Sequence, residues 1–266
     1  MITVCYVGIC VIMMLLENFL LFPAPRVDRG DWSPEFAHEE FEFTSSDGTE
    51  LHAWILPKKD AKRYIVYFHG NGAHVAFTGK KLNRLRTHFD ATVMGFDYRG
   101  YGKSKGAAHE RGILLDGVAA LDAFVKEQGI ETKDVILVGR SLGGSVATHV
   151  ASQRQVKALV IDSSFDSLMS VAWGHYPWLP VPMLMRNRMN TWKWAEEVEE
   201  PVIQFHGDED RTVPYKHGKK LHQAIASKNK KFVKIEGGRH NESTRLVFYD
   251  ETLVFIEGLA DEKAAR

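Results

Sequence analysis

The chain carries Ser141, Asp210 and His240 in an order that suits acyl transfer. A serine hydroxyl is a weak nucleophile at neutral pH. It therefore needs a base within hydrogen-bond reach, and the base needs a carboxylate to fix its tautomer. The order serine, acid, histidine is typical of a sheet whose nucleophile lies on a strand-to-helix turn. The residues thus predict Ser141 as the nucleophile, His240 as the base and Asp210 as the acid.

The sequence around Ser141 predicts such a turn. Gly139-Arg140-Ser141-Leu142-Gly143-Gly144 directly follows the apolar run 135–138, and the helix-compatible segment 145–152 comes next. The serine of a nucleophile elbow has a strained backbone, so its neighbours must be small. A Gly-x-Ser-x-Gly pattern between a buried strand and a helix is far more specific than the bare pattern.

Two aspartates compete for the role of the acid. Asp208 and Asp210 both follow the apolar strand 201–205. Asp210 precedes Thr212-Val213-Pro214, where the proline can begin the next helix. We therefore favour Asp210, with Asp208 as the alternative and the other carboxylate as a turn former.

His240 is the best candidate base, because it lies in a glycine-containing loop after the predicted strand 231–235. His149 is expected to be structural, and His175 is a weak candidate for substrate contact. Most of the other histidines are expected to be solvated on hairpins, helices and loops: His38, His52, His74, His88, His109, His217 and His222.

Acyl transfer also develops a negative oxygen, which preorganised N–H groups must stabilise. The elbow supplies one donor, the backbone N–H of Leu142. The second is expected from the loop His69-Gly70-Asn71-Gly72, through the backbone of Asn71. We expect His69 to brace this loop rather than to act as a second base.

Other chemistries lack support in the sequence. No metal-binding spacing and no phosphate-binding glycine loop is present, so neither a metal nor a cofactor is expected. The 34 basic and 34 acidic residues cancel, which gives no global field for nucleic acid. The two cysteines, Cys5 and Cys10, lie in the N-terminal segment, so the rest of the chain has no cysteine for a disulfide framework.

The elements that position these residues follow an α/β rhythm. Short apolar runs alternate with helical patterns, which predicts a mostly parallel sheet of about eight strands with helices on both faces. Ligands of such sheets bind beyond the carboxyl ends of the strands. The expected strands are 36–45, 51–56, 64–68, 91–96, 135–138, 156–161, 201–205 and 231–235.

Residues 165–194 interrupt this rhythm with four tryptophans and four methionines, three of which (Met183, Met185 and Met189) follow one another closely. Their place in the chain suits a small cap over an acyl pocket, since tryptophan and methionine adapt to apolar ligands. Trp173, Tyr176 and Met183 are candidate substrate contacts. Ordinary core packing of a helix pair is an equal alternative.

Residues 1–24 form an apolar segment before the expected hydrolytic domain, 25–266. Counted to Phe22, the apolar run has about the length of one membrane span, roughly 20 residues. We expect an uncleaved anchor, with a buried or interfacial helix and a signal peptide as alternatives. Arg26 and Arg29 weakly favour a cytoplasmic body but leave the orientation open.

Taken together, these motifs resemble the α/β-hydrolase superfamily. The matching residues include His69-Gly70-Asn71-Gly72, Asp97 to Ser104, Gly139 to Gly144, His206 to Pro214 and Gly238-Arg239-His240. The chain is similar more narrowly to a membrane-anchored branch with depalmitoylase-like and bacterial inner-membrane members. The resemblance implies the same nucleophile, acid and base, and it covers nearly the whole chain. One departure is that no cysteine cluster is present for lipidation.

The function predicted from the sequence is a serine hydrolase acting on carboxylic esters or thioesters with apolar acyl chains. A peptidase or amidase using the same three residues is the main alternative. A catalytically silent binding module tethered to a membrane is a third. The expected partners are a small or lipid-like acyl substrate and a membrane, but not nucleic acid.

Overall fold

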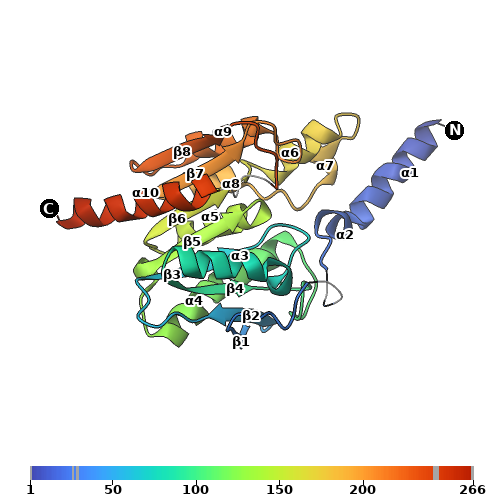
Figure 1. The fold of residues 1–266 in the computed structure, drawn as a ribbon. Helices are drawn as coiled ribbons and strands as arrows, with labels where there is room; N and C mark the ends of the chain where they lie inside the picture. Colours follow the sequence, from blue (N-terminus) through green and yellow to red (C-terminus); the bar gives the residue numbers. More distant parts are fainter. Residues whose placement is uncertain (1, 26, 28–29, 242–245, 265–266) are drawn as a thin grey trace.

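The computed structural model describes residues 2–25, 27, 30–241 and 246–264, and one sheet of eight strands forms its centre (Figure 1). The strand order is β1-β2-β4-β3-β5-β6-β7-β8. The strands are β1 Glu39–Thr44, β2 Glu50–Leu56, β3 Arg63–Phe68, β4 Ala91–Phe96, β5 Val135–Arg140, β6 Ala158–Asp162, β7 Val202–Gly207 and β8 Lys230–Ile235.

The sheet is parallel except at one edge. β2 pairs antiparallel with both β1 and β4, and every other neighbouring pair runs parallel. Most residues of the central strands are buried because helices cover both faces of the sheet, so these strands read as continuous apolar runs. The predicted α/β fold is confirmed, and β5, β7 and β8 end at the same edge.

Helices cover the two faces unequally. α3 and α10 pack on one face, where Leu82 and Phe248 join the core, while α4, α5, α8 and α9 pack on the other. The helices of the body are α3 Val75–His88, α4 Glu110–Gln128, α5 Leu142–Gln153, α6 Leu168–His175, α7 Val181–Leu184, α8 Thr191–Ala195, α9 Tyr215–Ala224 and α10 Leu246–Ala264, with a 3₁₀ turn at Thr132–Asp134.

Residues 165–194 leave the sheet after β6 and return at α8. They contain the short helices α6 and α7, which lie beside the N-terminal helices in Figure 1. Met185 and Leu179 are buried here in a small apolar cluster with Cys10 of the N-terminal segment. This cluster is separate from the two clusters on the faces of the sheet.

The N-terminal segment forms two helices, α1 Ile2–Leu15 and α2 Glu17–Leu21, instead of one continuous span. Within the described parts of the chain, no helix is both long and apolar enough to cross a membrane. The expected single transmembrane helix is corrected here: the Glu17 carboxylate accepts hydrogen bonds from the backbone of Arg186 and Asn187 at 2.7 and 2.8 Å, which holds the chain against residues 165–194. Arg26 and Arg29, on which the orientation depended, lie outside the described residues.

Candidate active site

Ser141 lies at a sharp turn between β5 and α5. Its φ of 51° and ψ of −118° are unusual for a residue with a side chain. The glycines beside it are required by close contacts: a Cβ on Gly143 would lie 2.1 Å from the carbonyl oxygen of Phe68, and one on Gly139 would lie 2.4 Å from that of Gly143. The turn therefore has the geometry of the predicted nucleophile elbow.

His240 lies between the other two predicted residues. Its Nε2 is 3.1 Å from Oγ of Ser141, and its Nδ1 is 2.6 Å from Oδ2 of Asp210. With the Nδ1 proton donated to the carboxylate, Nε2 is left free to accept the serine proton. Asp210 is only 5% exposed, so its charge acts on the imidazole with little screening by water.

The structure distinguishes the two aspartates by their contacts. Asp210 Oδ1 accepts hydrogen bonds from the backbone N–H groups of Thr212 and Val213, both at 2.9 Å, which leaves Oδ2 to face His240. Asp208 instead accepts from the N–H of Gly237 at 2.7 Å. Asp210 therefore contacts the histidine, while Asp208 braces the loop that carries it.

The loops of Asp210 and His240 meet at two glycines. A Cβ on Gly207, the last residue of β7, would lie 2.1 Å from the carbonyl oxygen of Gly238. The backbone N–H of Glu209 also donates to that oxygen at 3.1 Å. Only a glycine at position 207 allows this approach, and it brings the acid within reach of the base.

Sequence reasoning did not give a role to Arg140, the variable residue of the elbow. Its Nη2 donates to the carbonyl oxygen of His240 and to Oδ1 of Asn241, both at 2.7 Å. Its Nε lies 3.6 Å from the buried carboxylate of Asp162, which Lys81 also contacts at 3.3 Å. Burial lowers the pKa of Lys81 to about 8, against the opposing effect of Asp162. The only indication of this role in the sequence is that Arg140 directly precedes Ser141.

The predicted oxyanion residues lie beside the elbow. Leu142 is the first residue of α5, so its N–H points out of the helix start without an intrahelical partner. A Cβ on Gly70 would lie 3.5 Å from Cβ of Ser141, which places the loop of Asn71 against Ser141. His69 is buried, its Nδ1 donates to the carbonyl of Gly70 at 2.8 Å, and burial lowers its pKa to about 4. These contacts fit the expected bracing role.

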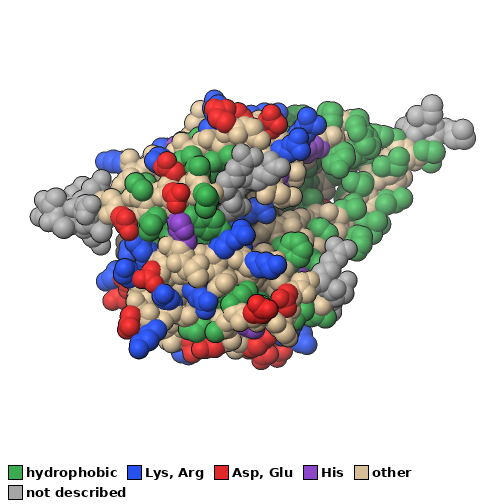
Figure 2. Space-filling model, viewed as in Figure 1, with side chains coloured by type: hydrophobic (Ala, Val, Ile, Leu, Met, Phe, Trp, Pro, Cys, Tyr) green, Lys and Arg blue, Asp and Glu red, His purple; other side chains and the backbone are tan. Residues whose placement is uncertain are grey.

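The three predicted substrate contacts separate in the structure. Tyr176 lines a cavity of about 430 Å³ together with Trp178, Leu179 and residues of α1 and α2. Trp173 and Met183 are not in its lining, and their exposed fractions are 53% and 84%. Hydrophobic side chains cover α1 and the neighbouring part of 165–194 (Figure 2).

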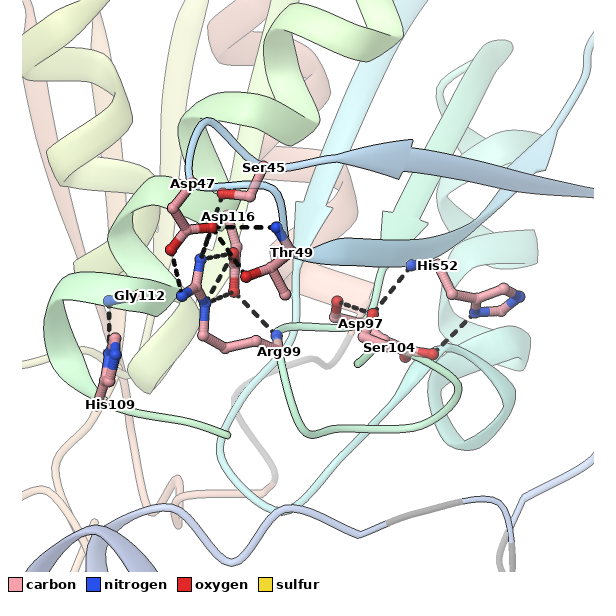
Figure 3. A network of polar contacts seen from close by, with 10 residues as sticks. All are labelled: Ser45, Asp47, Thr49, His52, Asp97, Arg99, Ser104, His109, Gly112 and Asp116. Carbon is pink, nitrogen blue, oxygen red and sulfur yellow. Dashed lines mark hydrogen bonds and ion pairs between the residues drawn. The ribbon is translucent and has the colours of Figure 1, made fainter. Parts of the chain in front are cut away.

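A second serine, histidine and aspartate lie close together near the turn after β4 (Figure 3). Nδ1 of His52 is 2.9 Å from Oδ2 of Asp97, and Nε2 of the same ring contacts the carboxylate of Glu40. Ser104 accepts a hydrogen bond from the backbone N–H of His52 at 2.9 Å and donates to the carbonyl of Asp97 at 2.6 Å. Here the serine does not contact the imidazole.

The expectation that most other histidines are solvated was wrong for three of them. His52 and His217 are 4% and 3% exposed, and His74 is fully buried. His217 Nδ1 lies 2.6 Å from Oδ1 of Asp166, so a carboxylate compensates its burial. The helical or hairpin positions of these histidines are visible in the sequence, but Asp97 and Asp166, which face His52 and His217, come from distant segments.

Among the described residues, no group of three or more histidine, cysteine or carboxylate side chains is arranged to hold a metal ion.

The family model of the alpha/beta hydrolase family matches residues 65–228, and the chain belongs to this family. The alpha/beta hydrolase domain-containing protein WAV2 of Arabidopsis thaliana is 29% identical over 248 residues, which cover 85% of this chain and 80% of that protein. A protein of Saccharomyces cerevisiae that is named a membrane protein is 25% identical over 242 residues, covering 85% and 84%.

Among solved structures, an esterase of Pyrococcus furiosus superimposes with a TM-score of 0.72 at 18% identity. The match covers 88% of this chain and 97% of that one. At this identity the likeness concerns the fold, and together with the family it makes the chain a hydrolase of the α/β type.

Proposed function

We propose that the protein is a serine hydrolase that cleaves carboxylic ester or thioester bonds of substrates with apolar acyl groups. The observation that carries this proposal is the line of contacts from Asp210 through His240 to a serine held in a strained backbone conformation. An α/β-hydrolase relative in fold is named an esterase, which supports the same reaction class.

In the proposed mechanism, Oγ of Ser141 attacks the carbonyl carbon while Nε2 of His240 takes its proton. The backbone N–H groups of Leu142 and Asn71 stabilise the resulting oxyanion. The tetrahedral intermediate collapses to an acyl-enzyme as His240 gives its proton to the leaving alkoxide or thiolate. Water, activated by the same imidazole, then releases the acid and restores the serine.

The preference for apolar substrates is supported by the surroundings of the site. We propose that residues 165–194 form a cap, since they carry exposed aromatic and methionine side chains outside the sheet: Trp173, Tyr176, Trp178, Met183 and Trp192. The N-terminal helices, residues 1–24 in our proposed division, add further exposed apolar side chains: Val4, Val7, Ile12, Leu15 and Phe19.

We further propose that these apolar side chains lie against a membrane surface. Their exposure is unusual for a protein surface facing water alone. Flotation of the full chain with phosphatidylcholine vesicles is the test. The double variant Leu15→Ser, Phe19→Ser should remain with the soluble fraction, because both side chains are 77% exposed. Equal flotation of the two proteins would contradict the proposal.

A fluorophosphonate probe tests the nucleophile. It should label the wild type, and Ser141→Ala should abolish the labelling. Ser104→Ala is the matched control, because Ser104 also lies beside a histidine and an aspartate yet contacts only backbone atoms. Labelling that survives Ser141→Ala would reject the assignment.

A comparison of p-nitrophenyl esters with aminoacyl anilides tests the bond that is cleaved. Esters should be preferred. A higher kcat/KM for anilides would assign the site to amide hydrolysis.

A further inference from the structure

The N-terminal helices and the 165–194 segment line an open cavity of about 430 Å³ outside the three-residue site. This volume falls within the range of small-molecule sites, about 300–1,000 Å³. Its walls come from two parts of the chain more than 140 residues apart. Its lining includes the apolar residues Met13, Leu21, Ala172, Trp178 and Leu179.

The cavity is apolar even though Glu17 contributes to its lining. The Glu17 side chain is 6% exposed, and its oxygens accept from the N–H groups of Arg186 and Asn187 and from Nε of Arg186 at 2.7, 2.8 and 3.0 Å. A carboxylate with these partners is satisfied within the protein. Glu17 therefore fastens α2 to the 165–194 segment and leaves an apolar space beside the joint.

A second set of contacts strengthens the same joint. Nδ2 of Asn187 donates to Oδ1 of Asn18 at 2.8 Å, and Oδ1 of Asn187 accepts from the N–H of Glu110 at the start of α4. The hydroxyl of Tyr6 donates to the carbonyl of Trp178 at 2.8 Å. The N-terminal helices are thus joined to the body at several points rather than being attached only through the chain.

The wall of the cavity is also hydrogen-bonded to a loop beside Ser141. Leu21 lines it, and its carbonyl oxygen accepts from Nδ2 of Asn71 at 2.6 Å. Oδ1 of the same asparagine accepts from the hydroxyl of Tyr101 at 2.6 Å, which fixes the amide. Asn71 belongs to the loop whose Gly70 lies against Ser141. One wall of the cavity is therefore a single hydrogen bond away from the proposed oxyanion loop.

We infer that this cavity binds the acyl chain of the substrate and that α1 and α2 form one of its walls. This inference rests on the proposed function, because it names where the apolar part of the substrate lies. It gives the N-terminal segment a role in substrate choice in addition to any contact with a membrane.

The test fills the cavity in the full chain. Ala172→Phe places a ring in it, whereas Gly174→Phe, on the same helix, places one in open space, since a Cβ at Gly174 meets no atom within 4 Å. p-Nitrophenyl esters from acetate to palmitate are compared by kcat/KM. Ala172→Phe should lose about tenfold or more on the long esters and keep the acetate rate, because hydrophobic pockets discriminate on this scale. Gly174→Phe should match the wild type throughout.

Loss of the hydrogen bonds that join Glu17 to Arg186 and Asn187 gives an independent test. Glu17→Ala should lower the long-chain rates in the same direction as Ala172→Phe, and Glu17→Gln, which keeps an acceptor, should lower them less. Losses by Ala172→Phe that are equal for acetate and long chains, or no loss on long chains, would overturn the inference while leaving ester hydrolysis established.

Binding without turnover separates this inference from the proposed function. In the full chain carrying Ser141→Ala, a bromine-labelled dodecanoic acid below its micellar concentration should quench tryptophan fluorescence saturably. Trp178→Phe should remove most of the quenching, because Trp178 lines the cavity. Quenching with no esterase activity in the wild type would reject the proposed reaction and retain the cavity as a fatty-acid site. Quenching unaffected by Trp178→Phe would reject the cavity.

Discussion

Two groups of serine, histidine and aspartate occur in this protein, and they differ in what the imidazole contacts. In the Ser141 group one ring nitrogen faces a carboxylate and the other faces the serine hydroxyl. In the Ser104 group both ring nitrogens face carboxylates, those of Asp97 and Glu40. The serine of the second group is bonded to backbone atoms.

Under the proposed function, this difference gives proton transfer to the Ser141 group and a supporting role to the Ser104 group. Two carboxylates around an imidazole favour its protonated form, in which neither ring nitrogen has a lone pair for a serine proton. Burial lowers the pKa of His52, but the contacts with Asp97 and Glu40 outweigh it, and the result is a raised pKa. Asp97 also accepts from the backbone N–H groups of Val75 and Lys103. The Ser104 group therefore fixes the turn after β4 to β2 and the start of α3.

The largest effect is expected from the nucleophile. Ser141→Ala should lower kcat for a preferred ester by about 10⁶-fold, because the residues of such a triad act as a unit. Steady-state kinetics with a p-nitrophenyl ester measure this loss, and the melting temperature serves as the control for folding. Ser104→Ala should keep kcat within a few-fold. A comparable loss from the two variants would erase the distinction between the groups.

The second largest effect is expected from replacing the carboxylate of Asp210. Asp210→Asn should lower kcat by about 10⁴-fold with little change in KM, because the amide favours the wrong imidazole tautomer. Asp208→Asn is the matched control: it stands two residues away and braces Gly237 without contacting His240. Equal activity of wild type and Asp210→Asn would show that another carboxylate serves the histidine.

The corresponding change in the second group should act on stability. Asp97 is fully buried and accepts from three groups, so Asp97→Asn should lower the free energy of unfolding by about 3–5 kcal/mol, the range for breaking a buried pair. Urea denaturation measures it. At urea concentrations below its unfolding transition, the folded Asp97→Asn variant should still be labelled by the fluorophosphonate probe. A stable but unlabelled variant would contradict a purely supporting role.

A smaller stability loss is expected for Ser104→Ala. It removes the acceptor of the buried His52 N–H, which costs about 1–3 kcal/mol when the donor stays unsatisfied. The same urea titration detects it. A variant as stable as the wild type would mean that the turn rearranges to satisfy this donor.

The pH dependence of stability should be the smallest of these effects. Because the folded-state pKa of His52 is raised, its contribution to stability is complete below its unfolded value of 6.5 and is lost as the pH rises through the folded-state pKa. The Glu40 carboxylate behaves oppositely: burial raises its pKa, but Lys103 and His52 lower it to about 2, so its contribution is lost only in acid.

The midpoints of urea unfolding at pH 6 and pH 8.5 test the direction of this pH dependence. The wild type should lose stability over this interval, and His52→Gln should lose less. An equal pH dependence in both proteins would show that His52 is not the group responsible.

The sequence was sufficient for the sheet. It also placed Ser141, Asp210 and His240 at one edge of the sheet, where their side chains are in contact, and their catalytic roles stay predictions. Both depend on local signals: buried parallel strands are continuous apolar runs, and motifs at their carboxyl ends must meet at one edge. The position of Asp210 past the strand end and before Pro214 and the family resemblance both favour Asp210 over Asp208, and only Asp210 contacts His240.

The remaining features depend on partners far apart in the chain. His52 looked like a hairpin surface residue, yet Asp97 lies 45 residues away and makes its burial possible. Glu17 looked like a charge at the boundary of a membrane span, but its partners Arg186 and Asn187 are about 170 residues away. No local sequence pattern predicts pairs of residues that are so far apart in the chain. Arg140 was overlooked for the same reason, since its contact with the His240 carbonyl crosses the edge of the sheet.

The backbone of Ser141 also limits which nucleophiles this scaffold can evolve. At a φ of 51° a residue branched at Cβ is sterically disfavoured, whereas an unbranched side chain is tolerated. Cysteine could therefore replace the serine and convert the site to thiol chemistry without a new backbone. Threonine carries the same hydroxyl group but is sterically disfavoured at this turn, because it is branched at Cβ. At this turn, the backbone conformation restricts which side chain can be present, independently of how reactive that side chain is.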